Sequence, residues 1–162
     1  MYKIKLLILL LTSIIITSCT DRIKKDIYKI SVGYIGGEYD GLVLSNQLSS
    51  KLNNFGLLDN NSRYEIQGEI SHSQDLFITN IDNTSDREQV NSSTKIKIFD
   101  KKQDCFTYFF YESISQFYIL ASSDKFISNK VAVEEIKLEN TEYLVKKFVN
   151  SLDRRNFTCD EK

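Results

Sequence analysis

Two long segments that alternate between polar and apolar residues constrain the fold of this chain more than any other feature. The first is Arg87–Asp100 and the second is Cys105–Tyr118, with the polar residues 101–104 between them. One face of the first segment carries Val90, Ser92, Thr94, Ile96 and Ile98. Two strand patterns divided by a few polar residues are typical of a β-hairpin, so we predict that these segments pair as antiparallel strands.

The second segment of this hairpin is aromatic on both faces. One face carries Phe106, Tyr108, Phe110 and Ile114, and the other carries Phe109, Tyr111 and Phe117. A strand that is half exposed needs only one apolar face, so two apolar faces indicate cover from both sides. We expect helices of this chain on one face and a partner protein on the other. The alternative is that the second face packs on the protein's own loops.

The remaining patterns are two more alternating segments, at 26–37 and 63–72, and two segments with helical spacing. The first helical segment follows Asp40, the expected N-cap, and ends at Gly56. Its apolar stripe consists of Leu44, Leu48, Leu52 and Phe55. The second helical segment covers residues 131–152. This order predicts an α+β domain in which two helices pack on one face of an antiparallel four-stranded sheet (β-α-β-β-β-α).

The N-terminus is typical of a secreted protein. Lys3 and Lys5 precede the apolar run Leu6–Ile16, which is shorter than the roughly 20 residues that a membrane-spanning helix needs. The run ends in Ile-Thr-Ser followed by Cys19, an arrangement similar to the bacterial lipobox. We therefore predict that Cys19 is acylated and becomes the first residue of the mature protein. A plain signal peptide with a chance cysteine is the alternative.

These features divide the chain into a lipoprotein signal peptide at 1–18, a lipidated tether at 19–26, one α+β domain at 27–155 and a polar tail at 156–162. Thr20, rather than an aspartate, follows the cysteine, which favours the outer membrane over the inner membrane. The domain is then expected on the periplasmic side, in an oxidising compartment.

Several classes of function are not indicated. His72 is the single histidine, and a solvated surface position is expected for it rather than a catalytic one. One histidine and two distant cysteines do not supply a metal site, and no cofactor motif is present. The formal net charge is −1, so no basic surface for nucleic acid is expected. We predict a binding protein that is not an enzyme.

The mature chain resembles the LPS-assembly lipoprotein LptE family, most clearly from Tyr64 to Leu152. The resemblance rests on a strand that begins with arginine after a polar loop, "SDREQVNSSTKIKIFD", and a strand that ends in "SQFY". These are followed by "SSDKFI" and by an acidic entry, "VEE", into the last helix. The order and spacing of these segments carry the resemblance, since no single motif is diagnostic.

The resemblance implies an outer-membrane lipoprotein that plugs the lumen of a large β-barrel, LptD, helps this barrel to assemble and binds lipopolysaccharide. A barrel wall could then cover the second aromatic face of the hairpin. An auxiliary lipoprotein of another periplasmic transport or secretion complex is the alternative.

Hairpin topology suggests where lipopolysaccharide would bind. The start of the third strand lies beside the end of the fourth in such a hairpin, so Arg87 is expected near Lys125 and Lys130. Arginine and lysine both bind phosphate, and these three residues are our candidate contacts for lipid A. The alternative is that they only keep the loops soluble.

The same topology predicts how close two cysteines lie to each other. Cys105 begins the fourth strand, and the last helix should run back along this strand and bring Cys159 near it. A disulfide between Cys105 and Cys159 is one expectation, and two free thiols are the other.

Overall fold

The computed structural model describes residues 28–78, 86–119, 126–152 and 157–159. The predicted lipidation site Cys19 and the predicted phosphate contact Lys125 lie outside these residues, as do the signal peptide and the tether. The elements are β1 (Ile30–Gly36), α2 (Glu38–Asn54), β2 (Tyr64–Ile78), β3 (Asp86–Asp100), β4 (Cys105–Ile119) and α3 (Phe126–Leu152).

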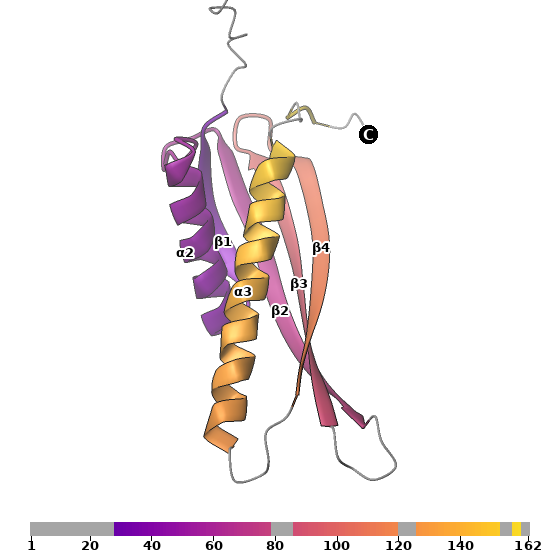
Figure 1. Cartoon of the computed structure of the whole chain (residues 1–162). Coiled ribbons are helices and arrows are strands. Elements are labelled where there is room, and N and C mark those ends of the chain that lie inside the picture. The colour runs from indigo at the N-terminus through magenta and orange to yellow at the C-terminus, as the bar shows by residue number, and fades with distance from the viewer. Residues whose placement is uncertain (1–27, 79–85, 120–125, 153–156, 160–162) are drawn as a thin grey trace, which may run out of the picture.

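The four strands form one sheet in the order β1-β2-β3-β4, and both helices cover the same face of it (Figure 1). The predicted α+β architecture is therefore confirmed. The expectation of a fully antiparallel sheet is wrong, because β1 pairs with β2 in parallel, Ile30 opposite Tyr64. The reason is the helix between them. At about 1.5 Å per residue, α2 carries the chain back along the length of β1, so that β2 starts at the same end.

The hairpin prediction is confirmed over its full length. β3 pairs antiparallel with both β2 and β4, so that Ile96 lies opposite Gly68 on one side and Phe110 on the other. The predicted inner residues of β3, from Val90 to Ile98, are all buried under the helices. Leu44, Leu48 and Leu52 of α2 and Leu144, Val145 and Phe148 of α3 complete the core.

The first helix begins earlier than predicted. Gly37, with φ 115°, precedes Glu38, so the expected cap at Asp40 is wrong. A Cβ atom at Gly37 would lie 2.6 Å from the carbonyl oxygen of Ile70, which shows how closely this turn approaches β2. Gly56, with φ 65°, ends the helix as predicted, but Phe55 is exposed and does not belong to the core.

The second helix packs on the sheet through two kinds of contact. Its C-terminal half is apolar, with Phe148 against the ring of Phe110 at 5.4 Å. In its middle, the buried Asn140 donates a hydrogen bond to Ser92 Oγ (2.9 Å) and accepts one from Gln116 Nε2 (2.8 Å). No helix within the described segments has the length and hydrophobicity needed to cross a membrane.

The polar tail contains one core residue. Phe157 is buried, and its ring centroid lies 4.9 Å from that of Tyr28 and 5.1 Å from that of Tyr64. Phe157 is thus an exception within the predicted polar tail, because an aromatic ring gains more by covering the end of the core than by facing water.

Candidate functional site

The sheet face that the helices leave uncovered, here called the outer face, is the most extensive candidate surface of the domain. It is formed by Glu65, Gln67, Glu69 and Ser71 of β2, by Asn91, Ser93, Lys95, Lys97 and Phe99 of β3, and by Phe106, Phe109, Tyr111, Ser113, Ser115, Phe117 and Ile119 of β4. Charged and polar residues therefore occupy the β2 side of this face, and apolar residues follow β4.

The apolar side chains of the outer face gather along β4, the edge strand of the sheet. We call the rings of Phe99, Phe106, Phe109, Tyr111 and Phe117 the aromatic stripe. Phe109 is 60% exposed, Tyr111 66% and Phe117 57%. The single charged residue of β4 is Glu112, which pairs with Lys147 of α3 (3.2 Å) and so belongs to the helix side. The outer face of β4 thus combines large apolar side chains with an absence of charge.

A β-bulge adds Phe106 to this stripe. The sequence pattern predicts Phe106 on the same face as Tyr108, but the register shifts so that Ile98 lies opposite Tyr108 and Phe99 opposite Phe106. An extra residue in one strand turns the side chains beyond it to the other face. The Phe106 ring consequently lies 5.3 Å from that of Phe99 and 5.9 Å from that of Phe109.

Lysines of β3 border the aromatic stripe. The Lys97 ammonium lies 5.3 Å from the Phe106 ring and 5.9 Å from the Phe109 ring, as in cation–π contacts. Lys95 instead pairs with Glu69 of β2 at 3.0 Å, and this carboxylate raises the lysine pKa. A partner that covers the stripe would therefore meet an apolar centre with a charged border, the composition found in stable protein interfaces.

Two of the basic residues predicted to contact phosphate, Arg87 and Lys130, lie toward one end of the domain. Arg87 is exposed and lies opposite Ile119 in the register of β3 and β4. Lys130 is exposed in the second turn of α3, and the start of α3 lies at the same end as the start of β3 (Figure 1). The structure thus places these two cations toward one end of the sheet, without a direct contact between them among the described interactions.

His72 is not the surface residue that the sequence suggests. Its side chain is 3% exposed, and Nδ1 forms a 2.7 Å hydrogen bond with Ser92 Oγ. Burial lowers the pKa of His72, although the Asp40 carboxylate, 4.0 Å from Nε2, acts in the opposite direction. The imidazole is therefore neutral at pH 7. The cause is the length of β2, which continues past His72 and places it under both helices.

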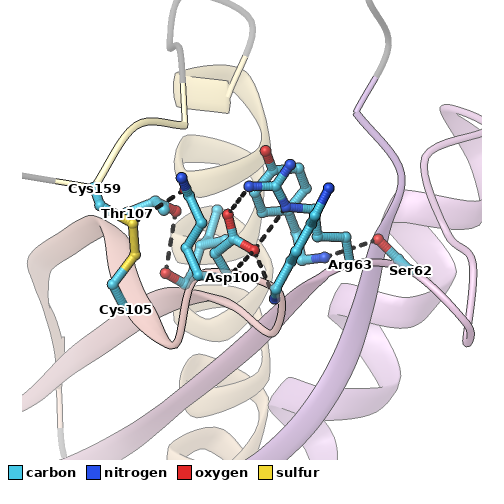
Figure 2. A network of polar contacts seen from close by, with 10 residues as sticks. Ser62, Arg63, Asp100, Cys105, Thr107 and Cys159 are labelled. Atoms are coloured by element: carbon cyan, nitrogen blue, oxygen red, sulfur yellow. Dashed lines mark hydrogen bonds and ion pairs between the residues drawn. A yellow bond between two sulfur atoms is a disulfide. The ribbon is translucent and has the colours of Figure 1, made fainter.

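A polar network secures the opposite end of the hairpin (Figure 2). The Asp100 carboxylate is buried, receives hydrogen bonds from both Arg63 Nε (2.7 Å) and Arg63 Nη2, and accepts the backbone N–H of Lys102 at 2.9 Å. The Arg63 guanidinium holds the pKa of Asp100 below its usual value. The β3–β4 turn is thereby fixed to the start of β2.

The structure joins Cys105 and Cys159 in a disulfide beside this network, with their Cα atoms 6.1 Å apart (Figure 2). Together with the burial of Phe157, this bond attaches the tail to the first residue of β4. The sequence pattern contains no direct signal for the partners of Asp100 or for the position of Phe157, since both depend on segments that are distant in the chain.

No protein-family model matches this chain, and no curated protein matches it in sequence. Solved structures of bacterial lipoproteins share its fold. A minor lipoprotein from Acinetobacter baumannii has a TM-score of 0.60 and 12% sequence identity, over 84% of this chain and 98% of that one. The rare lipoprotein B from Shewanella oneidensis has a TM-score of 0.53 and 10% identity, over 77% of this chain and 96% of that one. These similarities establish the fold of the domain.

Proposed function

We propose that this chain is an outer-membrane lipoprotein of the LptE type, which is anchored through Cys19, seals and helps to assemble the LptD barrel, and binds lipopolysaccharide in transit. The observation that carries this proposal is the exposed aromatic stripe on the outer face, which the chain's own described elements leave uncovered. The leader with its lipobox and the fold shared with bacterial lipoproteins support the same role.

The stripe fits a lasting contact better than a brief encounter. Aromatic residues dominate the energetics of stable interfaces, and charged residues are depleted at their centres. A long edge strand with exposed rings and little charge is also a site of aggregation unless a partner covers it. A barrel wall would supply such cover while leaving the helix layer on the other side of the sheet. The domain then acts by binding rather than by catalysis.

The double substitution Phe109→Glu with Tyr111→Glu tests the partner. We expect the full-length variant to be recovered with the barrel at least roughly tenfold less than the unmodified chain. Two charges would replace two rings that the barrel is proposed to cover. The measurement is crosslinking in outer membranes followed by pull-down and mass spectrometry. Leu42→Glu with Phe55→Glu is the matched control, since Leu42 of α2 and Phe55, which caps this helix, are 57% and 56% exposed but lie outside the outer face.

The control variant should be recovered with the barrel as well as the unmodified chain. Recovery of the unmodified chain with a different envelope complex would favour the auxiliary role in transport or secretion. Absence of any outer-membrane barrel from the pull-down of the unmodified chain would contradict the proposal.

The double substitution Arg87→Glu with Lys130→Glu tests lipopolysaccharide binding. Each charge-assisted contact to phosphate is strong, so reversing both charges should weaken binding of lipopolysaccharide by the purified full-length protein about tenfold or more. Lys102→Glu with Lys146→Glu produces the same change in net charge at exposed positions elsewhere and should have little effect. Equal losses in the two variants would show that only overall charge matters and would remove Arg87 and Lys130 as a specific site.

A further inference from the structure

A groove on the helix side of the domain shares only Lys130 with the contacts proposed above. It lies between the start of α2 and the N-terminal half of α3, with His72 of β2 among its lining residues, and its volume is about 360 Å³. The apolar residues that line it are Tyr39, Val43, Val131 and Leu138. Tyr39 is 71% exposed, and Val131 and Leu138 are each 51% exposed, so this apolar surface faces water.

The polar groups that line the groove largely have hydrogen-bond or ion-pair partners within the protein. His72 bonds to Ser92 through Nδ1, Thr141 Oγ1 donates to the carbonyl oxygen of Lys137 at 2.7 Å, and Lys137 pairs with Glu134 at 3.0 Å. A peptide in this groove would bring backbone N–H and C=O groups that need partners, and burying them without partners is costly. A hydrocarbon chain has no such requirement.

The charges and the volume of the groove limit which ligand could bind there. Lys130 is exposed at the groove, with no ion pair to another described residue, whereas Asp40, Glu134 and Glu135 are the acidic residues of the lining. Of the two lysines in the lining, Lys137 pairs with Glu134, so Lys130 is the cation that can meet a head group with a single negative charge. A volume of about 360 Å³ lies at the small end of ligand sites, which suits one chain rather than several.

We propose that this groove binds a single-chain anionic amphiphile, a long-chain fatty acid, with its hydrocarbon chain against Tyr39, Val131 and Leu138 and its carboxylate at Lys130. This site is separate from the aromatic stripe on the outer face, so it stands or falls independently of the barrel interaction. It shares Lys130 with the contacts proposed for lipopolysaccharide, but Arg87 does not line the groove and the ligand is of a different class.

The test uses membranes that contain the full-length protein and a photoactivatable analogue of palmitic acid. After irradiation, mass spectrometry should find the label on peptides of α3 that include Val131 or Leu138. Unlabelled fatty acids should compete with a potency that rises by up to about fourfold per methylene, the increment expected for burying hydrocarbon. Lys130→Gln should weaken labelling by the acid but not by its methyl ester.

Leu138→Glu should reduce labelling at least tenfold, and Val131→Gln, which is a milder change at an equally exposed position, should reduce it as well. Phe55→Glu, an exposed site at the far end of α2, is the matched control and should leave labelling unchanged. Labelling that is spread over the outer face, that Leu138→Glu does not alter, or that only lipopolysaccharide or two-chain phospholipids displace would overturn the proposal. Recovery with the barrel, measured on Leu138→Glu and Val131→Gln, should not change, so failure of one proposal is distinguishable from failure of the other.

Discussion

Replacing Cys105 and Cys159 together by serine is expected to lower the free energy of unfolding by about 4 kcal/mol, the value that loop-closure entropy gives for a bond across 54 residues of sequence. The bond closes a loop that contains all of α3, so the unfolded chain loses many conformations when it is present. Its removal also releases the segment that carries Phe157 onto the core. The full-length variant should therefore unfold at a clearly lower urea concentration than the unmodified protein.

Urea unfolding of the oxidised protein, with and without a thiol reductant, measures this effect. The reductant should destabilise the unmodified protein and leave the double serine variant unchanged. Peptide mapping of the non-reduced protein should show that both cysteines resist alkylation. Two alkylatable thiols at Cys105 and Cys159, or stability unaffected by reduction, would contradict the prediction.

Asp100→Asn is expected to destabilise the domain by about 2–4 kcal/mol at pH 7, because it leaves Arg63 without the carboxylate that accepts two of its hydrogen bonds. Asparagine has nearly the same shape as aspartate, so the loss of stability measures the effect of the carboxylate charge rather than of side-chain volume. Its pH dependence follows from the lowered pKa of Asp100. The stabilisation is complete above the ordinary aspartate pKa of about 3.9 and is lost as the pH falls through the lower pKa of the folded state.

Urea unfolding at pH 7 and near pH 3 tests the predicted direction of this pH dependence. The difference between the unmodified protein and Asp100→Asn should be largest at pH 7 and should shrink at acidic pH, where Asp100 takes up a proton more readily in the unfolded chain than in the folded protein. Glu69→Gln is the control, since the ion pair of Glu69 with Lys95 is exposed and is expected to contribute at most about 1 kcal/mol. A difference that stays constant between the two pH values would show that the charge of Asp100 does not stabilise the fold.

These two predictions concern the same end of the domain. The register places Ile30, Tyr64, Asp100 and Cys105 side by side, so the entry of the chain into β1, the β3–β4 turn and the tail are fastened together. The start of α2 and the N-terminal half of α3, which line the groove, lie away from this end, as do the first residues of β3 (Figure 1). The domain therefore has a covalently reinforced end, which follows the predicted lipid tether, and an opposite end that carries the candidate ligand contacts.

Sequence periodicity alone determined the number, order and type of the elements. A period of two identified the strands, and in β3 it identified the buried face correctly, because a pleated strand places alternate residues on opposite faces regardless of its neighbours. Helical spacing likewise predicted the core leucines of α2. The two aromatic faces of β4 also led directly to the expectation of an uncovered outer face.

Tertiary contacts determined the features of the fold that the periodicity of the sequence does not record. The direction of β1 depends on the end to which α2 returns the chain, and a bulge, which no local pattern marks, moved Phe106 to the outer face. The burial of His72 and Phe157 depends on helices and strands far away in the sequence. A local pattern records only which side of a helix or strand prefers apolar surroundings. Pairing partners, register shifts and the burial of a face by another element are long-range contacts, and these contribute to stability only once the chain has folded.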